Sequence, residues 1–445
     1  MIIKNGKAAL PGQNKLASVA IRIDSVGKIA EIGGNLTGDD DILDAAGLII
    51  LPGGIDPHVH FDDPGYTHRE DFEHGTCAAA SGGITTVIDM PCTSIPPIIN
   101  IDNLMQKLDA IKSKAVIDYG FFGGVSAQSF EKGFPENMML LSEFVLGYKT
   151  YFISGMAEFG QLDYFHFQMA LEIADALEMP VLLHAEDYGT VTDATETAKH
   201  NGNSPMDYYR SRPEIAETIA VEKAIGIAKN IGADLHIVHI ATAEAAAMIA
   251  GTDITGETAP HYLEFNKDDF QRIGSSLKTT PPVKSPGNRE KLWQMLADGA
   301  IDFVASDHAP CPESEKNTGS IWTDYAGIPG TGTLLPYMFS EGYMKGRISL
   351  KRLVEITSSA AASRYGIDDR KGSIAVGKDA DFAIIDPNAT WTIKGAKFLS
   401  KGKITPFEGM EFKGKIVKTI VRGNVVYDSK MGILANAGYG QFLSA

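Results

Sequence analysis

The stretch LIILPGGIDPHVHF, residues 48–61, decides the fold of this chain. It begins with consecutive apolar residues, as expected of a strand that is buried on both faces. It ends in His58-Val59-His60, and residues two apart on a strand point to the same face, so both imidazoles can reach one point. The stretch therefore predicts a buried strand whose carboxyl end carries two polar rings.

Seven further apolar or β-branched runs follow this first strand. They cover residues 84–90, 115–125, 144–153, 180–186, 235–242, 254–262 and 301–309. Helical patterns separate most of them. One apolar helical face, at spacings of three and four, holds Phe167, Ala170, Leu171, Ala174 and Leu177. Another predicted helix places Pro213 in its first turn and ends on Gly232, a suitable C-cap.

Eight strands with intervening helices predict an α/β fold, a (β/α)8 TIM-like barrel over residues 53–366. This span exceeds the usual length of about 250 residues and leaves room for long loops over the barrel mouth. A doubly wound open sheet is the alternative. It is disfavoured because no Gly-rich phosphate loop follows the first strand.

The two ends of the chain read differently from the middle. Residues 1–52 and 367–445 alternate apolar and polar side chains at the strand period, between frequent turn residues. We expect both ends to pair into one small composite β-sandwich domain. Two separate hairpins docked on the barrel are the alternative.

The amino-acid composition limits which partners the protein can bind and in which cellular compartment we expect it. The chain has 445 residues, 44% of them hydrophobic, and 56 acidic against 40 basic residues give a net charge of −16. No basic stripe offers a site for nucleic acid or for an anionic membrane. Three cysteines cannot form a disulfide framework, the start lacks a signal-peptide core, and no run of about 18 apolar residues is present. We expect a cytoplasmic protein.

Polar residues stand at the carboxyl ends of the predicted strands, where a buried strand should not tolerate them. They are His58, His60, Lys149, His184, His239 and Asp307. In a barrel these strand ends line one face, which holds the active site. Neutral imidazole and carboxylate suit zinc and similar divalent metals, so the set predicts a metal site. Taken singly, each histidine could be a hydrogen-bonded structural residue, and Asp307 could be an ordinary helix cap.

A purely structural role is harder to assign to Lys149 than to the histidines. It lies among Val145, Leu146, Tyr148, Tyr151 and Phe152. An ammonium in such surroundings loses hydration, so its pKa should fall. A neutral lysine amine can take up carbon dioxide, and the resulting carbamate is an anionic oxygen ligand able to bridge two metals. A carboxylated Lys149 would thus complete a site for two divalent ions, for which zinc is the expected metal.

The predicted ligands indicate hydrolysis of an amide-like bond. Two metals about 3.5–4 Å apart lower the pKa of water and polarise a carbonyl. Asp307 could take the proton of the attacking water and pass it to a leaving nitrogen, acting as the catalytic base and then the acid. No Gly-x-Ser-x-Gly motif or Cys-His arrangement offers a covalent competitor. We interpret Cys92, just past the second strand, as a packing or substrate-contact residue.

Over essentially its whole length the sequence resembles the cyclic amidohydrolases: dihydroorotases, allantoinases and hydantoinases. The matching strings include LPGGIDPHVHFDDPG, GYKTYF, LLHAED, HIVHIAT, ETAPHYL and ASDHAP. The resemblance implies that His58, His60, Lys149 and Asp307 hold one metal, and Lys149, His184 and His239 the other. It also implies that His261 lies near the substrate or in the layer of residues around the metal ligands.

Within this family, the choice of substrate depends on side chains that contact it. The sequence departs from the dihydroorotase pattern at Asp62, where those enzymes have an Arg that holds a carboxylate, and at Cys92, where they have Asn. A carboxylate at position 62 would repel a substrate carboxylate. Thr280 also departs from that pattern. Gly330, in the GIPGTGT loop, is a candidate for backbone contacts to substrate.

Allantoinases are closer in several places. HVHFDDPG, SIPP, RSRPEIAETIAVEKA and the small Ser154 after the lysine strand are similar to their motifs. We therefore expect an allantoinase-like ring-opening hydrolase of a cyclic amide or ureide. Dihydroorotase, or a hydrolase of another cyclic imide or hydantoin, is the alternative. A non-catalytic assembly protein on the same fold is an alternative of another class. We expect a homo-oligomer, a dimer or a tetramer.

Overall fold

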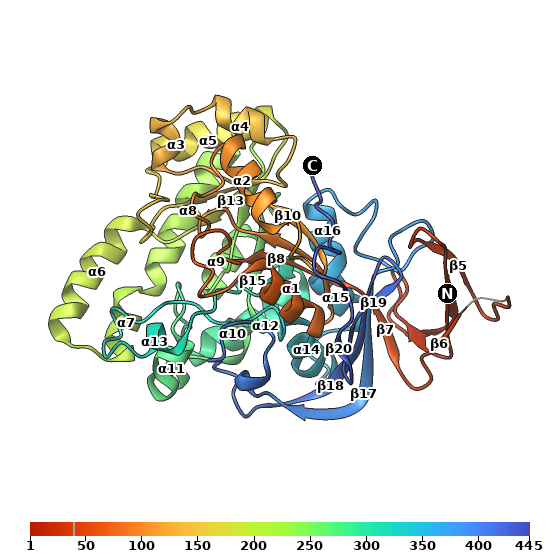
Figure 1. The fold of residues 1–445 in the computed structure, drawn as a ribbon. Coiled ribbons are helices and arrows are strands. Elements are labelled where there is room, and N and C mark those ends of the chain that lie inside the picture. The colour runs from red at the N-terminus through yellow and green to blue at the C-terminus, as the bar shows by residue number, and fades with distance from the viewer. Residues whose placement is uncertain (39–40) are drawn as a thin grey trace.

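The computed structural model describes residues 1–38 and 41–445. Its centre holds parallel strands in two sheets, of three strands in the order β10-β9-β8 and of six in the order β11-β12-β13-β14-β15-β16 (Figure 1). The bounds are β8 Gly54–Val59, β9 Ile84–Asp89, β10 Asp118–Phe121, β11 Gly123–Gly124, β12 Tyr148–Tyr151, β13 Val181–His184, β14 Leu235–Ile237, β15 Thr255–Thr258 and β16 Phe303–Val304. All eight predicted strand segments are thus present.

The two central sheets follow one another along a shared segment of chain. β10 and β11 are separated by Phe122 alone, whose amide donates to the Asp89 carbonyl at 3.1 Å. On the far side, the His60 amide donates to the His308 carbonyl at 2.8 Å, which joins the end of β8 to the segment after β16. The ladder stops early there because Asp307 has a φ of 50°, outside the extended region. The fold is therefore mixed α/β, and its parallel strands form two separate hydrogen-bonded sheets, which we call the two arcs.

Helices lie between most of the parallel strands and cover their outer side (Figure 1). In the first half of the chain they are α1 Phe72–Ser81, α2 Ile101–Ile111, α3 Ala127–Glu131, α4 Glu136–Leu141, α5 Tyr164–Ala176, α6 Tyr188–Asn201 and α7 Pro205–Ser211. Later ones are α8 Glu214–Ile231, α9 Ala243–Ile249, α10 Pro260–Glu264, α11 Lys267–Ile273, α12 Pro286–Asp298, α13 Glu313–Lys316, α14 Leu334–Tyr337, α15 Leu350–Val354 and α16 Ala360–Arg364. Two π-helical turns, η2 Met338–Met344 and η3 Glu355–Ser359, continue α14 and α15.

Local sequence explains where the two best-predicted helices begin and end. α5 buries Phe167, Ala170, Leu171 and Ala174, the face predicted from spacing, and the Asp163 side chain accepts the His166 amide at its start. α8 begins after Pro213 and ends at Gly232, whose φ of 89° only glycine adopts freely. Both helices are confirmed, but Leu177 is the C-cap of α5 and not part of its buried face, and Pro213 is the N-cap of α8 and precedes its first turn.

The two ends of the chain meet in a second group of sheets (Figure 1). A four-stranded sheet, β5-β4-β1-β6, comes from the first residues alone: β1 Ile2–Lys4, β4 Ala20–Ile23, β5 Ile29–Gly33 and β6 Ile42–Asp44. A seven-stranded sheet, β20-β19-β18-β17-β7-β2-β3, contains β2 Lys7–Ala8, β3 Ala17–Ser18, β7 Ile49–Pro52, β17 Phe382–Thr392, β18 Glu411–Val421, β19 Asn424–Asp428 and β20 Gly432–Ile433. β17 pairs antiparallel with β7, with Phe382 opposite Pro52.

The last residues of the chain leave this β region and return to the central sheet. The Tyr119 amide donates to the Gln441 carbonyl at 3.0 Å, and the Leu443 amide donates to the Tyr119 carbonyl at 2.8 Å. The end of the chain therefore extends the edge of β10. We expected all of residues 367–445 to lie in the β domain, and the pairing of the last residues with β10 was not predicted.

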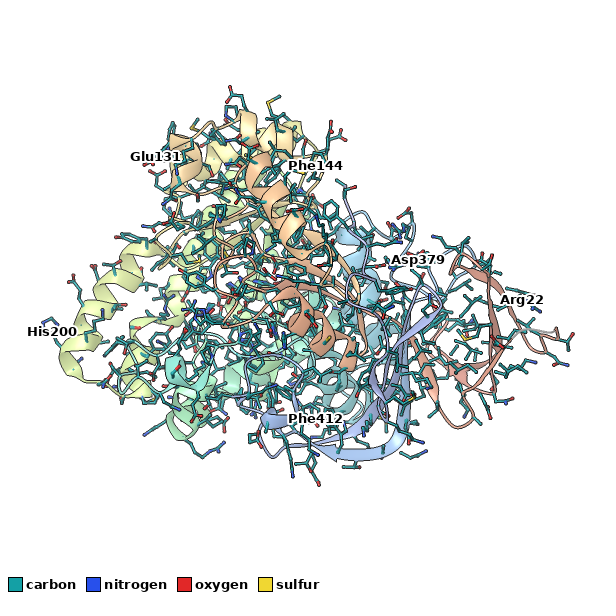
Figure 2. All side chains as sticks on the ribbon, in the orientation of Figure 1. Arg22, Glu131, Phe144, His200, Asp379 and Phe412 are labelled. Carbon is teal, nitrogen blue, oxygen red and sulfur yellow. The ribbon has the colours of Figure 1, made fainter. Side chains whose placement is uncertain are left out.

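Side chains fill the space between the helices and the strands, and between the central sheets and the β region that carries Asp379 and Phe412 (Figure 2). One large apolar cluster runs from the central strands to β18, and a smaller one lies between the two terminal sheets. No helix in the described ranges has the length and apolar character needed to cross a membrane.

Candidate metal centre

A cavity of about 580 Å³ opens at the carboxyl ends of the parallel strands, and we call it the strand-end cavity. Side chains from separate strands line it: His58, His60, Cys92, Tyr151, His184, His239 and Asp307. Five of the six predicted metal ligands thus line one hollow, and Lys149 lies just behind it. The convergence follows from the parallel direction of the strands, whose carboxyl ends share one face.

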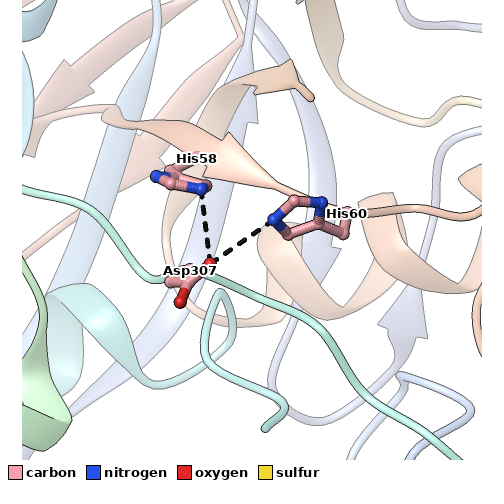
Figure 3. A group of neighbouring side chains, drawn as sticks. All are labelled: His58, His60 and Asp307. Carbon is pink, nitrogen blue, oxygen red and sulfur yellow. Dashed lines mark ion pairs between the residues drawn. The ribbon is translucent and has the colours of Figure 1, made fainter. Parts of the chain in front are cut away.

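His58, His60 and Asp307 approach one another most closely (Figure 3). Oδ1 of Asp307 lies 3.3 Å from Nε2 of His58 and 3.4 Å from Nε2 of His60. Ligand atoms of the three residues lie within 4.8 Å of one another, and both imidazoles are buried. Asp307 reaches this point because its φ of 50° turns the chain out of the strand.

Glu257 fixes which nitrogen of His58 faces the cavity. Nδ1 of His58 lies 2.5 Å from Oε1 of Glu257, so this nitrogen carries the proton and donates to the carboxylate. Nε2 is then a lone pair that faces the carboxylate oxygen of Asp307. Two electron-rich atoms in this position require a cation or a proton between them. A carboxylate behind a histidine is the usual arrangement for a metal-ligating imidazole.

His184 and His239 repeat this arrangement on the other side of the cavity. Nε2 of His184 lies 2.9 Å from Oε2 of Glu186, which leaves Nδ1 directed at Nε2 of His239, 2.9 Å away. Arg212 contacts the same Glu186 carboxylate and holds its pKa down to about 2, although burial alone would raise it. Glu186 therefore stays ionised and orients His184.

Lys149 lies on β12 with a fully buried amine. Its Nζ has no hydrogen-bond partner among the described residues and lies 4.7 Å from the centre of the Tyr151 ring. Burial lowers the pKa of Lys149 to about 8, and the neighbouring Cys92, Glu257 and Asp307 only partly restore it. A buried amine with no acceptor fits a group that is modified or covered in the working protein.

The charges in the cavity favour an ionised Asp307, neutral His58 and neutral His239, whereas Cys92 and Asp307 raise the pKa of His60 to about 10 although burial lowers it, so His60 must lose a proton to bind a metal. Burial raises the pKa of Asp307, but His58 and His60 outweigh it and hold this pKa below its ordinary value. Burial lowers the pKa of His58 and of His239 well below the ordinary value for histidine. Neutral imidazole and ionised carboxylate are the forms that bind metals, so the donor set fits a pair of divalent cations.

The predicted substrate contacts divide into two groups. Cys92, Ser154 and Thr280 line the strand-end cavity. The Cys92 thiol lies 3.1 Å from the Tyr151 hydroxyl and 3.7 Å from Nδ1 of His60. The Ser154 hydroxyl donates to the Phe159 carbonyl, and the Thr280 hydroxyl contacts that of Tyr208 at 2.7 Å. All three are placed to touch a bound molecule.

Asp62, His261 and Gly330 lie outside that lining. Asp62 is buried, and its burial raises the pKa of its carboxyl to about 7. His261 is buried on α10, and burial lowers its pKa to about 4. The Gly330 amide donates to Nδ1 of His308 at 3.0 Å, so it supports the segment that follows Asp307. These positions suit support of the cavity wall.

Sequence reasoning missed several residues that shape the cavity. Glu257 and Glu186 were not singled out, although a charged residue inside the run ITGET is the same signal that identified Lys149. Arg69 was missed because two of its partners, Glu315 and Tyr325, are distant in sequence. Its guanidinium lies between the rings of Tyr66 and Tyr325, at 4.6 and 4.5 Å, in the mouth of the cavity.

Comparison with known proteins agrees with this architecture. Residues 49–426 match the family described as Amidohydrolase family. The chain belongs to the amidohydrolase family. It is 34% identical to the allantoinase of Escherichia coli strain SMS-3-5, over 100% of this chain and 98% of that protein. The allantoinase of Escherichia coli strain K12 gives the same identity and coverage.

Solved structures of cyclic amidohydrolases superpose on the whole chain. The L-hydantoinase (dihydropyrimidinase) from Arthrobacter aurescens has a TM-score of 0.94 and 30% identity, and the match covers 100% of this chain and 99% of that one. A D-hydantoinase has a TM-score of 0.91 and 32% identity, with 99% and 98% covered. This amidohydrolase therefore belongs to the cyclic amidohydrolase group and is a hydrolase of carbon–nitrogen bonds in cyclic amides.

Proposed function

We propose that the protein opens a cyclic amide or ureide by binuclear-metal-dependent hydrolysis, with allantoinase-like specificity. One observation carries the proposal. Carboxylates behind His58 and His184 direct imidazole lone pairs into the cavity that also holds Asp307, with the amine of Lys149 just behind it. Nδ1 of His184 meets another imidazole nitrogen, Nε2 of His239, and Nε2 of His58 meets the Asp307 carboxylate. Atoms that bind metals thus face one another beside a space large enough for ions and a small ring.

The ligand assignment follows from these positions. His58, His60, Lys149 and Asp307 would hold one ion, and Lys149, His184 and His239 the other. Lys149 would bridge them as its carbamate, since burial lowers the pKa of the amine to about 8 and so increases the fraction of the neutral form that takes up carbon dioxide. When bound, two divalent ions, zinc by expectation, would lower the pKa of water and polarise the substrate carbonyl.

Asp307 is the proposed proton carrier. Its neighbours keep its pKa below the ordinary value, so it is ionised at neutral pH and can accept the proton of the attacking water. It then passes this proton to the ring nitrogen as the carbon–nitrogen bond breaks. The products are a carboxylate and a free N–H group, so one water is added across the bond.

The choice of ring rests on the cavity walls and on the relatives. The 34% identity to allantoinases over the full chain supports a ureide ring. Cys92, Ser154 and Thr280 offer a thiol and hydroxyls, and the two arginines of the lining, Arg69 and Arg212, already pair with Glu315 and Glu186, which suits a neutral ring with several N–H and C=O groups. Hydantoin is the second candidate, supported by the TM-score of 0.94 to an L-hydantoinase. Dihydroorotate is the third, and its carboxylate would need Arg69 or Arg212 as partner.

A substrate panel tests the proposal. We expect the zinc-reconstituted protein to hydrolyse allantoin faster than hydantoin, dihydrouracil and dihydroorotate, measured as kcat/KM for each. A dominant rate on dihydroorotate would refute the ureide assignment. No turnover on any ring, with less than one bound divalent ion per chain, would favour the assembly-protein alternative.

The proposal also covers the closure of the barrel. The two arcs of parallel strands would be one (β/α)8 barrel, because the backbones of His58, His60 and His308 form hydrogen bonds across one gap and Phe122 spans the other.

The proposal further covers the location and the assembly of the protein, which would be a cytoplasmic homo-oligomer. Light scattering after gel filtration measures the assembly, and a monomer at micromolar concentration would contradict it.

A further inference from the structure

A second cavity lies between the central barrel region and the C-terminal strands, and we call it the junction cavity. Its volume of about 570 Å³ equals that of the strand-end cavity within a few per cent. Ser81 at the end of α1 forms one wall, and Trp391 on β17 and Lys415 on β18 form the opposite side. α1 packs against β18, β19 and β20 beside it. Nothing in the proposed hydrolysis uses this space.

The junction cavity is basic although the protein is acidic. Lys394, Lys397 and Lys415 line it, and no aspartate or glutamate is among its lining residues in the described chain. Lys394 and Lys397 are exposed, Lys415 is partly buried, and none of the three forms an ion pair with a described residue, whereas the whole chain carries a net charge of −16. Three unpaired ammonium groups around one hollow create a local positive potential that concentrates anions.

The walls of the junction cavity add aromatic faces and hydroxyl groups. Trp391, Phe398 and Tyr427 contribute rings. The Trp391 indole N–H already donates to the Gly414 carbonyl at 2.9 Å, so the indole offers the cavity its apolar surface. Ser429 contributes a hydroxyl group, whereas the Ser400 hydroxyl already donates to the Glu70 carboxylate at 2.5 Å. Flat apolar faces beside cations and hydroxyls match a planar ring that carries an anionic group.

We propose that the junction cavity is a binding site for a small planar organic anion, a ring bearing a phosphate or carboxylate. The anionic group contacts the lysines, and the ring lies against Trp391 and Tyr427. The junction cavity shares no lining residue with the strand-end cavity, although its His308 lies between Asp307 and Ala309 of that lining, and the proposal does not depend on the proposed hydrolysis. Its occupant differs in charge from the neutral rings proposed as substrates.

Phenyl phosphate is a suitable probe, with phenol and inorganic phosphate as controls for its two halves. We expect calorimetric titration of the metal-loaded protein to show phenyl phosphate binding at least about tenfold more tightly than either control, because only it uses both lysines and rings. Phenyl phosphate should also quench the fluorescence of Trp391, and this signal should disappear in Trp391→Phe.

A matched pair of lysine variants separates this site from the metal centre. Lys415→Gln removes a cation from the cavity, whereas Lys413→Gln removes an exposed one from the same strand. We expect Lys415→Gln to weaken binding about threefold or more and Lys413→Gln to leave it unchanged. The combined Lys394→Gln, Lys397→Gln and Lys415→Gln variant should abolish binding while keeping turnover.

Three results would overturn the proposal. They are no binding of phenyl phosphate, binding that survives the triple lysine variant, and binding equally strong for inorganic phosphate alone. A triple variant that changes the oligomeric state would instead assign the cavity to a subunit contact. Binding lost in the triple variant, with quenching lost in Trp391→Phe, supports it.

Discussion

The described chain contains two buried groups of side chains of the types that bind metals. One group, in the strand-end cavity, is His58, His60 and Asp307. The other, where β10 meets the C-terminal strands, is Asp118, Asp379 and Asp381. The second group is filled by the protein itself, since Lys371 Nζ lies 2.5, 3.0 and 2.8 Å from the three carboxylates in that order. Arg422 adds a second cation at Asp118.

The comparison shows that donor count alone does not define a metal site. In the carboxylate group, fixed cations neutralise the charge, so an ion has no place and no role. In the strand-end group, Asp307 has the imidazoles of His58 and His60 beside it and forms no ion pair with a lysine or arginine of the described residues, although the buried Lys149 amine is close enough to feel its charge. The first arrangement stabilises the fold, and the second requires a partner from outside the chain.

Replacing the proposed bridging ligand should have the largest effect. We expect Lys149→Ala to lower kcat/KM by about 10⁴-fold, since the shared ligand and the activated water are lost together. Elemental analysis should show fewer than two ions per chain, with the circular dichroism spectrum unchanged. Full metal content with normal turnover would rule out the carbamate bridge.

Asp307→Asn should have the next largest effect. The amide cannot accept a proton, so we expect kcat to fall by about 10²–10⁴-fold. Much of the bound metal should remain, because the other ligands are intact. Near-normal rates on the best substrate of the panel would remove Asp307 from the proton path.

Lys371→Met tests the other group. Removal of one partner from a buried ion network leaves uncompensated carboxylates, so the free energy of unfolding should drop by about 3–5 kcal/mol. Chemical denaturation measures it, and turnover per folded molecule should be unchanged. Lys28, a partly exposed partner of Asp379 at 2.7 Å, supplies the control. Lys28→Met should cost less than about 1 kcal/mol, and equal losses would contradict the argument from burial.

Glu257→Gln should have the smallest effect of the four. The side chain keeps its shape but no longer fixes the His58 proton as a carboxylate does, so metal affinity or activity should fall by about 10–100-fold. Competition with a chelator measures the affinity. An unchanged metal affinity would mean that the position of His58 on β8 orients its imidazole without the Glu257 carboxylate.

Periodicity and strand-end chemistry predicted much of this molecule. The eight strand segments and the helices α5 and α8 could be located because burial imposes a pattern on neighbouring residues. Five of the six predicted ligands could be brought to one cavity because parallel strands end on one face. The break in the strand ladder between β16 and β8 was not predicted, since it depends on the unusual φ of Asp307.

Contacts between residues that are distant in sequence could not be predicted from sequence patterns. Glu257 and His58 meet across 199 positions, and Lys371 and Asp118 across 253. Neither pair leaves a local signal beyond a charge in an apolar run. The position of Asp62 behind the cavity lining likewise depends on a single left-handed backbone angle, a φ of 51°.

The pairing of β7 with β17 has a consequence for synthesis of the chain. Ile49, Ile50 and Leu51 are buried in the finished sheet, but their antiparallel neighbour lies more than three hundred positions later. While the ribosome elongates the chain, β17 has not yet been made, so the hydrophobic edge of β7 is unpaired. It can then form non-native hydrogen bonds with strands of other chains. We therefore expect nascent chains to need protection by chaperones until β17 emerges.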